Sequence, residues 1–228
     1  MNPYYPVFIK IKDKTILVVG GGKIAERKVH ALLERGARVT VVSPDLTPQL
    51  QEWAAQGRVS WRCSRFAPGD LDGARLAICA TNDGAVNGQV AAEADARGVW
   101  LNVVDKPDLC EFIVPSAVLQ GDLTIAISTG GSSPALAKKI RRDLEALFGP
   151  EYAMFLALLR KVRPFIQRDI AGESERMAIF SELAHSTALD LMGAGRQQEA
   201  EREVRHILAR HGVRCPVAWD GGEEGDSA

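Results

Sequence analysis

The sequence predicts an α/β fold: a doubly wound parallel sheet, followed by a small α+β segment and a C-terminal helical region. Three observations support this prediction. An apolar, largely β-branched run at 15–19 stops at three glycines and passes at once into a helical pattern. Strand-like and helix-like stretches then alternate as far as residue 104, which is typical of a parallel sheet with right-handed crossovers. After residue 150 the signals are helical.

The expected elements of the sheet follow one another at short spacing. After the strand at 15–19, a helix at 22–35 has Ala25 and Val29 on its apolar side, and Gly36 fits its C-cap. Further apolar runs predict strands, and alanine-rich or periodic stretches predict helices. The remaining strands are expected at 38–42, 59–61, 75–80 and 100–104, and the helices at 46–56 and 84–97.

The pattern changes in the second part of the chain. Strands expected at 112–115 and 123–128 are separated by a short link, which indicates a hairpin or a meander. Ser133 as N-cap and Pro134 at the first helical position begin a helix that runs to about residue 148. Helical signals continue over 151–210, with breaks near 171–172 and 193–195.

Four parts follow from these patterns. They are a Rossmann-type domain at 1–112, an α+β segment at 113–150, a helical domain at 151–211 and a small, polar, acidic tail at 212–228 that we expect to be disordered.

Composition excludes several classes of protein. The chain has 228 residues, of which 25% are charged and 46% hydrophobic, and its formal net charge is −1. This balance gives no case for binding nucleic acid or a membrane surface. The longest apolar runs are too short to span a bilayer, and the N-terminus does not resemble a signal peptide. The four cysteines and four histidines are scattered, which fits a reducing cytoplasm and predicts no metal site.

The glycine turn predicts a dinucleotide site. Gly20 suits the tight turn after the strand, Gly22 lets the backbone approach a pyrophosphate, and Ala25 is small enough for the helix to pack on the strand. The amides of residues 22–25, Lys23 and Ile24 among them, would then point at the phosphates. The alternative is a tight strand–helix turn that binds no ligand.

Polar residues gather where the other strands end, at the edge of the sheet where ligands bind. The second strand is followed by Ser43 and Pro44, with Asp45 two residues late for the acid that usually holds the adenosine ribose. Because no arginine stands there to receive a 2′-phosphate, we expect NAD. Asp45 could instead begin a turn or cap a helix. The candidate cofactor-binding residues are Gly20, Gly22, Lys23, Ile24, Ser43, Pro44, Thr81, Asn82 and Val104.

Two of these strand ends allow alternative interpretations. Thr81 and Asn82 offer a hydroxyl and an amide to the inner half of a dinucleotide, or they form a capped turn before the next helix. Asp105 follows a buried-looking strand at the mouth of the expected crevice. A carboxylate partly shielded from water there could act as a proton acceptor, or Asp105 could be an ordinary loop residue.

A second glycine-rich turn precedes the helix that begins at Pro134. Its amides could bind a carboxylate or a phosphate, although it lacks the ending of a P-loop. The candidate substrate-binding residues there are Ser128, Thr129, Gly130, Gly131 and Ser132. Lys138, Lys139, Arg141 and Arg142 follow; they could attract an acidic ligand or form a solvated helix face.

Several motifs together resemble the siroheme synthase N-terminal family, the precorrin-2 dehydrogenases, of which some are also sirohydrochlorin ferrochelatases. The resemblance starts with the segments at 6–9 and 19–28. It continues, in the family's order, at 80–83, 102–105, 112–116 and 128–134. It covers most of residues 1–150, and the helical part to about residue 210 resembles the family more loosely.

The resemblance implies a function. The substrate would be precorrin-2, a reduced tetrapyrrole with eight carboxylates, and NAD⁺ would take a hydride to give sirohydrochlorin. Iron insertion would then give siroheme. Asp105 would be the catalytic residue, accepting a proton, and no resident metal is implied. The segment 113–150 would form a homodimer. Thr129 stands where some members have a phosphorylated serine.

A second function remains open, a regulatory module that binds NAD without turnover. Asp105 and the 128–133 turn favour the enzyme, because a sensor needs no base in its crevice. At this length we expect no methyltransferase-sized region beside the dehydrogenase.

Overall fold

The computed structural model describes residues 4–215 and divides the chain into two compact units, Met1–Val114 and Pro115–Ala228. The first unit is built on five parallel strands in the order β3-β2-β1-β4-β5. They are β1 (Thr15–Val19), β2 (Arg38–Val42), β3 (Val59–Arg62), β4 (Leu76–Cys79) and β5 (Trp100–Val103). The strand order reverses between β1 and β4, and such a switch point is where open parallel sheets bind ligands.

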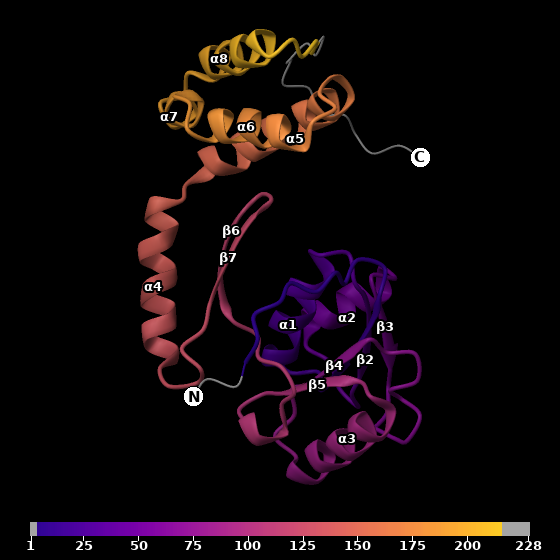
Figure 1. The fold of residues 1–228 in the computed structure, drawn as a ribbon. Helices are drawn as coiled ribbons and strands as arrows, with labels where there is room; N and C mark the ends of the chain where they lie inside the picture. The colour runs from indigo at the N-terminus through magenta and orange to yellow at the C-terminus, as the bar shows by residue number, and fades with distance from the viewer. Residues whose placement is uncertain (1–3, 216–228) are drawn as a thin grey trace. The chain divides into compact units, whose positions relative to one another are not determined.

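Helices cover both faces of this sheet (Figure 1). Helices α1 (Lys23–Leu33) and α2 (Pro48–Ala55) pack on one face, where Val29 and Leu50 meet Ile16 and Val18. Helix α3 (Gly84–Arg97) packs on the other face, through Val90 and its neighbours. Because successive residues of β1 point to opposite faces, all four of its apolar residues after Thr15 are buried.

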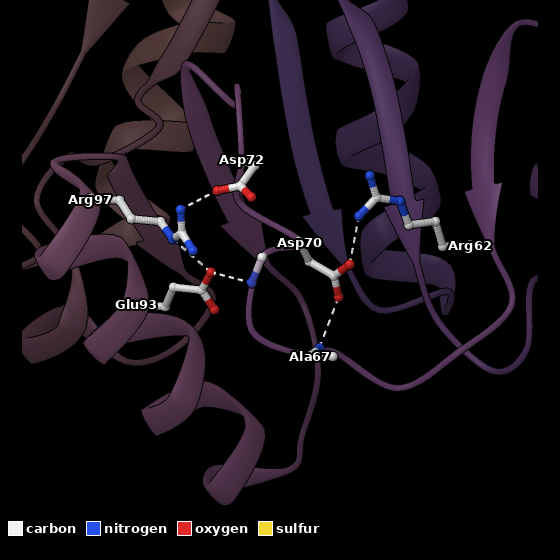
Figure 2. Close-up of polar contacts among 7 residues, drawn as sticks. Arg62, Ala67, Asp70, Asp72, Glu93 and Arg97 are labelled. Atoms are coloured by element: carbon white, nitrogen blue, oxygen red, sulfur yellow. Dashed lines mark hydrogen bonds and ion pairs between the residues drawn. The ribbon is translucent and has the colours of Figure 1, made fainter.

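The connection between β3 and β4 has no crossover helix, and polar contacts hold it instead (Figure 2). Asp70 accepts a hydrogen bond from the Ala67 amide at 2.8 Å and pairs with Arg62 at 2.6 Å. Glu93 on α3 accepts from the Gly69 amide at 2.7 Å, and Arg97 joins it at 2.8 Å while also pairing with Asp72. These pairs fix the loop to β3 and to α3.

The second unit begins with an antiparallel hairpin, β6 (Ser116–Gln120) and β7 (Leu123–Ile127), and helix α4 (Pro134–Leu147). Four more helices follow: α5 (Pro150–Asp169), α6 (Glu173–Ala184), α7 (Ala188–Gly193) and α8 (Gln197–Arg210). Their buried side chains, such as Val162, Leu183 and Val204, form a core of their own. None of the helices within residues 4–215 combines the length and the apolar composition that a transmembrane span requires.

The predicted fold class is confirmed, and most elements lie within a few residues of their expected bounds. The hairpin, the helix start at Ser133–Pro134 and the breaks near 171–172 and 193–195 are also confirmed. A further break at 185–187 was not predicted. A short 3₁₀ helix, η1 (Pro107–Leu109), was not predicted either.

The strand expected at 112–115 is wrong, because the first hairpin strand starts only at Ser116. The Phe112 carbonyl accepts from the Asn102 side chain at 2.9 Å, and the Phe112 ring packs against the core of the first unit. Pro115 has no amide hydrogen to donate to a ladder. Of the tail expected at 212–228, residues 216–228 lie outside the described part.

Candidate functional site

The glycine turn joins β1 to α1, and two of its three glycines are required by packing alone. Gly20 has a φ of +112°, and a Cβ atom there would lie 2.5 Å from the Ala80 carbonyl oxygen. A Cβ at Gly21 would lie 1.9 Å from the Asp45 carbonyl oxygen. A Cβ at Gly22 would meet nothing within 4 Å. The third glycine is therefore free of internal constraint and borders open space.

Helix α1 begins at this open space without a side-chain cap. Gly22 is its N-cap, whereas Thr47 and Asp83 cap α2 and α3 with side-chain oxygens. The first amides of a helix have no intrahelical acceptor, and together with the helix dipole they favour an anion. Lys23 and Ile24 are exposed there, and Lys23 pairs with Glu26 at 3.0 Å. This end of α1 fits the pyrophosphate of a dinucleotide.

The end of β2 lies beside the glycine turn. Ser43 is 8% exposed, and its carbonyl accepts from the Trp61 indole at 2.9 Å. Pro44 and Asp45 are exposed, and Thr47, not Asp45, caps the following helix. The helix-cap alternative for Asp45 is therefore wrong, and its carboxylate remains exposed next to the turn.

Thr81 and Asn82 occupy the turn between β4 and α3. The Thr81 hydroxyl accepts from the Asp83 amide at 3.1 Å, and the Thr81 carbonyl accepts from buried Asn87 at 3.3 Å. Asp83 caps the helix by accepting from two amides. The capped turn is thus present, while Asn82 is exposed and lies at the same edge of the sheet as the glycine turn.

Val104 and Asp105 follow β5 directly. The Val104 amide donates to the Cys79 carbonyl at 2.9 Å, and the Val104 side chain packs against the core below α1. Asp105 has a φ of +59°, a backbone conformation that residues other than glycine seldom adopt. Asp105 lies beyond the end of β5, and its side chain is exposed. Within the first unit, the carboxylate is therefore not shielded from water as expected.

Two residues near Asp105 were not predicted from the sequence, Lys28 and Cys110. Burial and the charge of Arg27 lower the pKa of the Lys28 ammonium, and the Asp105 carboxylate opposes them by raising it. Lys28 and Asp105 therefore interact electrostatically. Lys28 comes three residues after buried Ala25, so it lies at the border of the buried face of α1. This spacing could have indicated from the sequence that Lys28 is partly buried. Cys110 contacts the loop of Asp105 and gave no signal in the sequence.

The second glycine-rich turn lies in the second unit, between β7 and α4. Its amides are partly used internally: Gly130 donates to the Ser128 hydroxyl at 3.1 Å, and Ser132 donates to the Thr129 carbonyl at 3.0 Å. The Thr129 hydroxyl accepts from the Ser133 amide at 3.2 Å and donates to the Ser133 carbonyl at 3.1 Å. Gly131 has a φ of +84°. The turn is thus a closed loop that holds the start of α4.

The basic run on α4 is divided by its ion pairs. Lys139 pairs with Asp143 at 2.6 Å, and Arg141 pairs with Glu145. Lys138 and Arg142 are exposed, lie one turn apart and have no ion-pair partner within residues 4–215. These two cations are available to an acidic ligand. In the same described range, no three side chains of His, Cys, Asp or Glu are grouped so that they could hold a metal ion.

Two family models match the chain in succession. The family described as "Putative NAD(P)-binding" matches residues 7–116, and the family described as "Sirohaem biosynthesis protein central" matches residues 120–147. The chain is 39% identical over 223 residues to a siroheme synthase of Methylobacillus flagellatus, covering 97% of this chain and 48% of that protein. It is 37% identical over 205 residues to a siroheme synthase of Nitrosococcus oceani, covering 90% and 44%.

A solved structure agrees with these matches. The structure of SirC, a precorrin-2 dehydrogenase, aligns with a TM-score of 0.74 and 29% identity, covering 89% of this chain and 100% of that one. The chain spans about half the length of the curated relatives it matches. Both family segments, in this order, and the similarity over nearly the whole chain relate it to about half of the length of siroheme synthases.

Proposed function

We propose that the chain is an NAD-dependent dehydrogenase that oxidises precorrin-2 to sirohydrochlorin. The observation that carries the proposal is the pairing of an uncapped glycine turn with Asp105 at one edge of the parallel sheet. Similarity to siroheme synthases and to the SirC precorrin-2 dehydrogenase supports the choice of substrate.

The cofactor site would be formed by the glycine turn and the neighbouring strand ends. The amides of Lys23 and Ile24 would hold the pyrophosphate, and Asp45 the adenosine ribose. Arg62, the arginine that ends the neighbouring strand, is held by Asp70 at 2.6 Å, which supports NAD over NADP. When bound, NAD⁺ supplies the hydride acceptor.

Asp105 would take the proton that the substrate releases as its hydride leaves. The carboxylate is exposed on a short loop, so it can reach a large macrocycle. The Lys28 ammonium interacts electrostatically with this carboxylate. The role of Asp105 follows from family resemblance and is supported by its strained backbone, which is common at functional sites.

The acidic substrate would be attracted by the second unit. Lys138 and Arg142, which have no ion-pair partner within residues 4–215, would offer their cations to its carboxylates. We further propose that the protein is a homodimer formed through the hairpin and α4, and that it acts in the cytoplasm, which its four free cysteines support.

Anaerobic incubation of the purified protein with precorrin-2 and NAD⁺ tests the proposed reaction. We expect NADH absorbance to rise with time and protein concentration. A module that only senses NAD would bind it and form no NADH. Binding without NADH formation would therefore favour the regulatory alternative and remove the enzyme assignment.

A further inference from the structure

The outer edge of β5 is satisfied by side chains and by a short returning segment, not by a sixth strand. The Glu111 amide donates to the Leu101 carbonyl at 2.9 Å, and the Glu111 carboxylate accepts from the Leu101 amide at 3.1 Å. Asn102, 8% exposed, donates from its side chain to the Phe112 carbonyl at 2.9 Å. The segment after η1 is thereby attached to the strand that ends beside Asp105.

One sulfur atom completes this edge. The Cys110 Sγ accepts from the Val103 amide at 3.2 Å and lies 3.1 Å from the Val103 carbonyl oxygen, to which its S–H can donate. It also lies 3.2 Å from the Lys106 carbonyl oxygen and 3.6 Å from the Asn102 Nδ2. Because a thiol has one hydrogen, it donates to one of the two carbonyls at a time.

These contacts lie on both sides of Asp105 in the chain. Val103 lies two residues before it and Lys106 one residue after it, so one sulfur contacts the backbone on both sides of the carboxylate-bearing residue. The Lys106 amide returns to the Val103 carbonyl at 3.3 Å, which closes a tight turn. Asp105 adopts its left-handed conformation inside this turn, and such a conformation persists only when the surroundings hold it.

We propose that Cys110 is a positioning residue for Asp105, its thiol holding the turn that presents the carboxylate. The proposal rests on the proposed function, because Asp105 must be the group that acts on the substrate. Cys110 does not touch the reacting atoms in this account. It acts through the backbone of residues 103–106.

The protonation state of Cys110 is consistent with this role. Partial burial raises the pKa of its thiol, although a backbone hydrogen bond from Val103 opposes the shift. The thiol therefore remains protonated near neutral pH and keeps the hydrogen that it can donate to a carbonyl.

The test compares Cys110→Ala with Cys110→Ser, which retains a hydrogen-bonding hydroxyl, and with Cys215→Ser, which alters a thiol in the other unit. We expect Cys110→Ala to lower kcat about 10- to 100-fold, the effect of misplacing a catalytic group by about 1 Å, with the Kd for NAD unchanged. Cys110→Ser should recover most of kcat, and Cys215→Ser should match the wild type. If the alanine variant does not fold, Cys110→Val keeps the volume and takes its place.

A double-mutant cycle shows whether Cys110 acts through Asp105. In an Asp105→Ala background, Cys110→Ala should cause no further loss of kcat, because the positioned group is gone. An equal loss in both backgrounds would overturn the proposal, and so would a wild-type kcat in Cys110→Ala.

Amide hydrogen exchange separates this inference from the proposed function. The amides of Val103 and Lys106 should exchange faster in Cys110→Ala than in Cys215→Ser, whether or not the protein oxidises precorrin-2. If the wild type forms no NADH, the proposed function is wrong. The amide exchange rates then still show whether Cys110 stabilises the turn at residues 103–106. Unchanged exchange at these amides would overturn that holding role.

Discussion

At the scale of single residues, the glycine turn has two kinds of glycine. At Gly20 and Gly21 the backbone of neighbouring loops leaves no room for a Cβ atom, whereas Gly22 borders open space. The sequence predicted the roles of Gly20 and Gly22 but gave none to Gly21, because its neighbour Asp45 comes from a loop more than twenty positions away. Such an approach depends on tertiary structure, which local patterns do not reveal.

The two kinds of glycine predict different alanine variants. Gly21→Ala should destabilise the protein by about 1–3 kcal/mol, because its Cβ would overlap the Asp45 carbonyl. Gly22→Ala should unfold like the wild type but bind NAD more weakly, since the added methyl group enters the space assigned to the pyrophosphate. Chemical denaturation and NAD titration measure the two effects. Equal stability of both variants would contradict the packing argument, and unchanged NAD affinity in Gly22→Ala would contradict the placement of the pyrophosphate.

Asp105 provides the second prediction at this scale. Replacing it by alanine should lower kcat for dehydrogenation by about 100- to 10,000-fold, the usual contribution of a positioned acid or base, while NAD binding is retained. Asp108→Ala, which removes an exposed carboxylate from η1 in the same loop, is the matched control and should retain activity. Near-normal turnover in Asp105→Ala would contradict its assigned role.

At the scale of elements, the sequence predicted the strands and helices whose ends are set by capping residues, glycines and prolines. Ser133 and Pro134 start α4, and Gly98 ends α3 in a left-handed conformation. The error at 112–115 arose because an apolar run looks the same whether it pairs in a sheet or packs as a loop. Here the Asn102 side chain donates a hydrogen bond to the Phe112 carbonyl, so Phe112 is held in a loop and does not pair in a sheet. Likewise, no pattern indicated that a thiol would complete the edge of β5.

The end of α5 predicts a pH dependence of stability. Hydrogen bonds from the Arg168 side chain and the Arg214 amide lower the pKa of Asp169 to about 2. Because the folded pKa lies below the unfolded one, this carboxylate stabilises the fold above about pH 4. That contribution is lost as the pH falls toward 2.

Asp169→Asn checks this expectation. Its Tm should lie below the wild-type Tm at pH 7, and the difference should shrink as the pH falls from about 4 to about 2. Asp190→Asn, which changes an exposed aspartate of α7, serves as the control. A Tm difference that stays constant with pH would contradict the lowered pKa of Asp169 as the source of this stability.

At the scale of the whole molecule, the similarity to siroheme synthases and the two-unit architecture support one interpretation. The first unit offers a dinucleotide turn and a carboxylate at one sheet edge, and the second offers exposed cations and an amphipathic helix with one buried residue, Ala137. The strand tips of the site could be predicted because parallel strands end at a common edge. The helix position of Lys28 could be inferred from the sequence, but its approach to Asp105 could not, because the two residues are far apart in the chain. The contacts of Cys110 with Val103 and Lys106 could not be predicted either, because they depend on how the loop after β5 folds.

The proposed homodimer gives the prediction at this scale. Leu147 on α4 is 68% exposed, and burying it against a second copy would remove apolar surface from water. Leu147→Asp should therefore shift the protein from dimer to monomer in light scattering. Met177→Asp changes a residue of α6 that is 66% exposed and should leave the dimer intact. A monomeric wild type, or equal effects of both variants, would contradict this interface.

The most direct measurement is an anaerobic reaction in which NADH and sirohydrochlorin are quantified together. Protein, precorrin-2 and NAD⁺ should yield NADH and sirohydrochlorin in equal amounts, and the Asp105→Ala variant should bind NAD⁺ yet form both products at least about 100-fold more slowly. If the wild type bound NAD⁺ but formed sirohydrochlorin no faster than the background without protein, the assignment of the glycine turn and Asp105 to an oxidation site would be wrong.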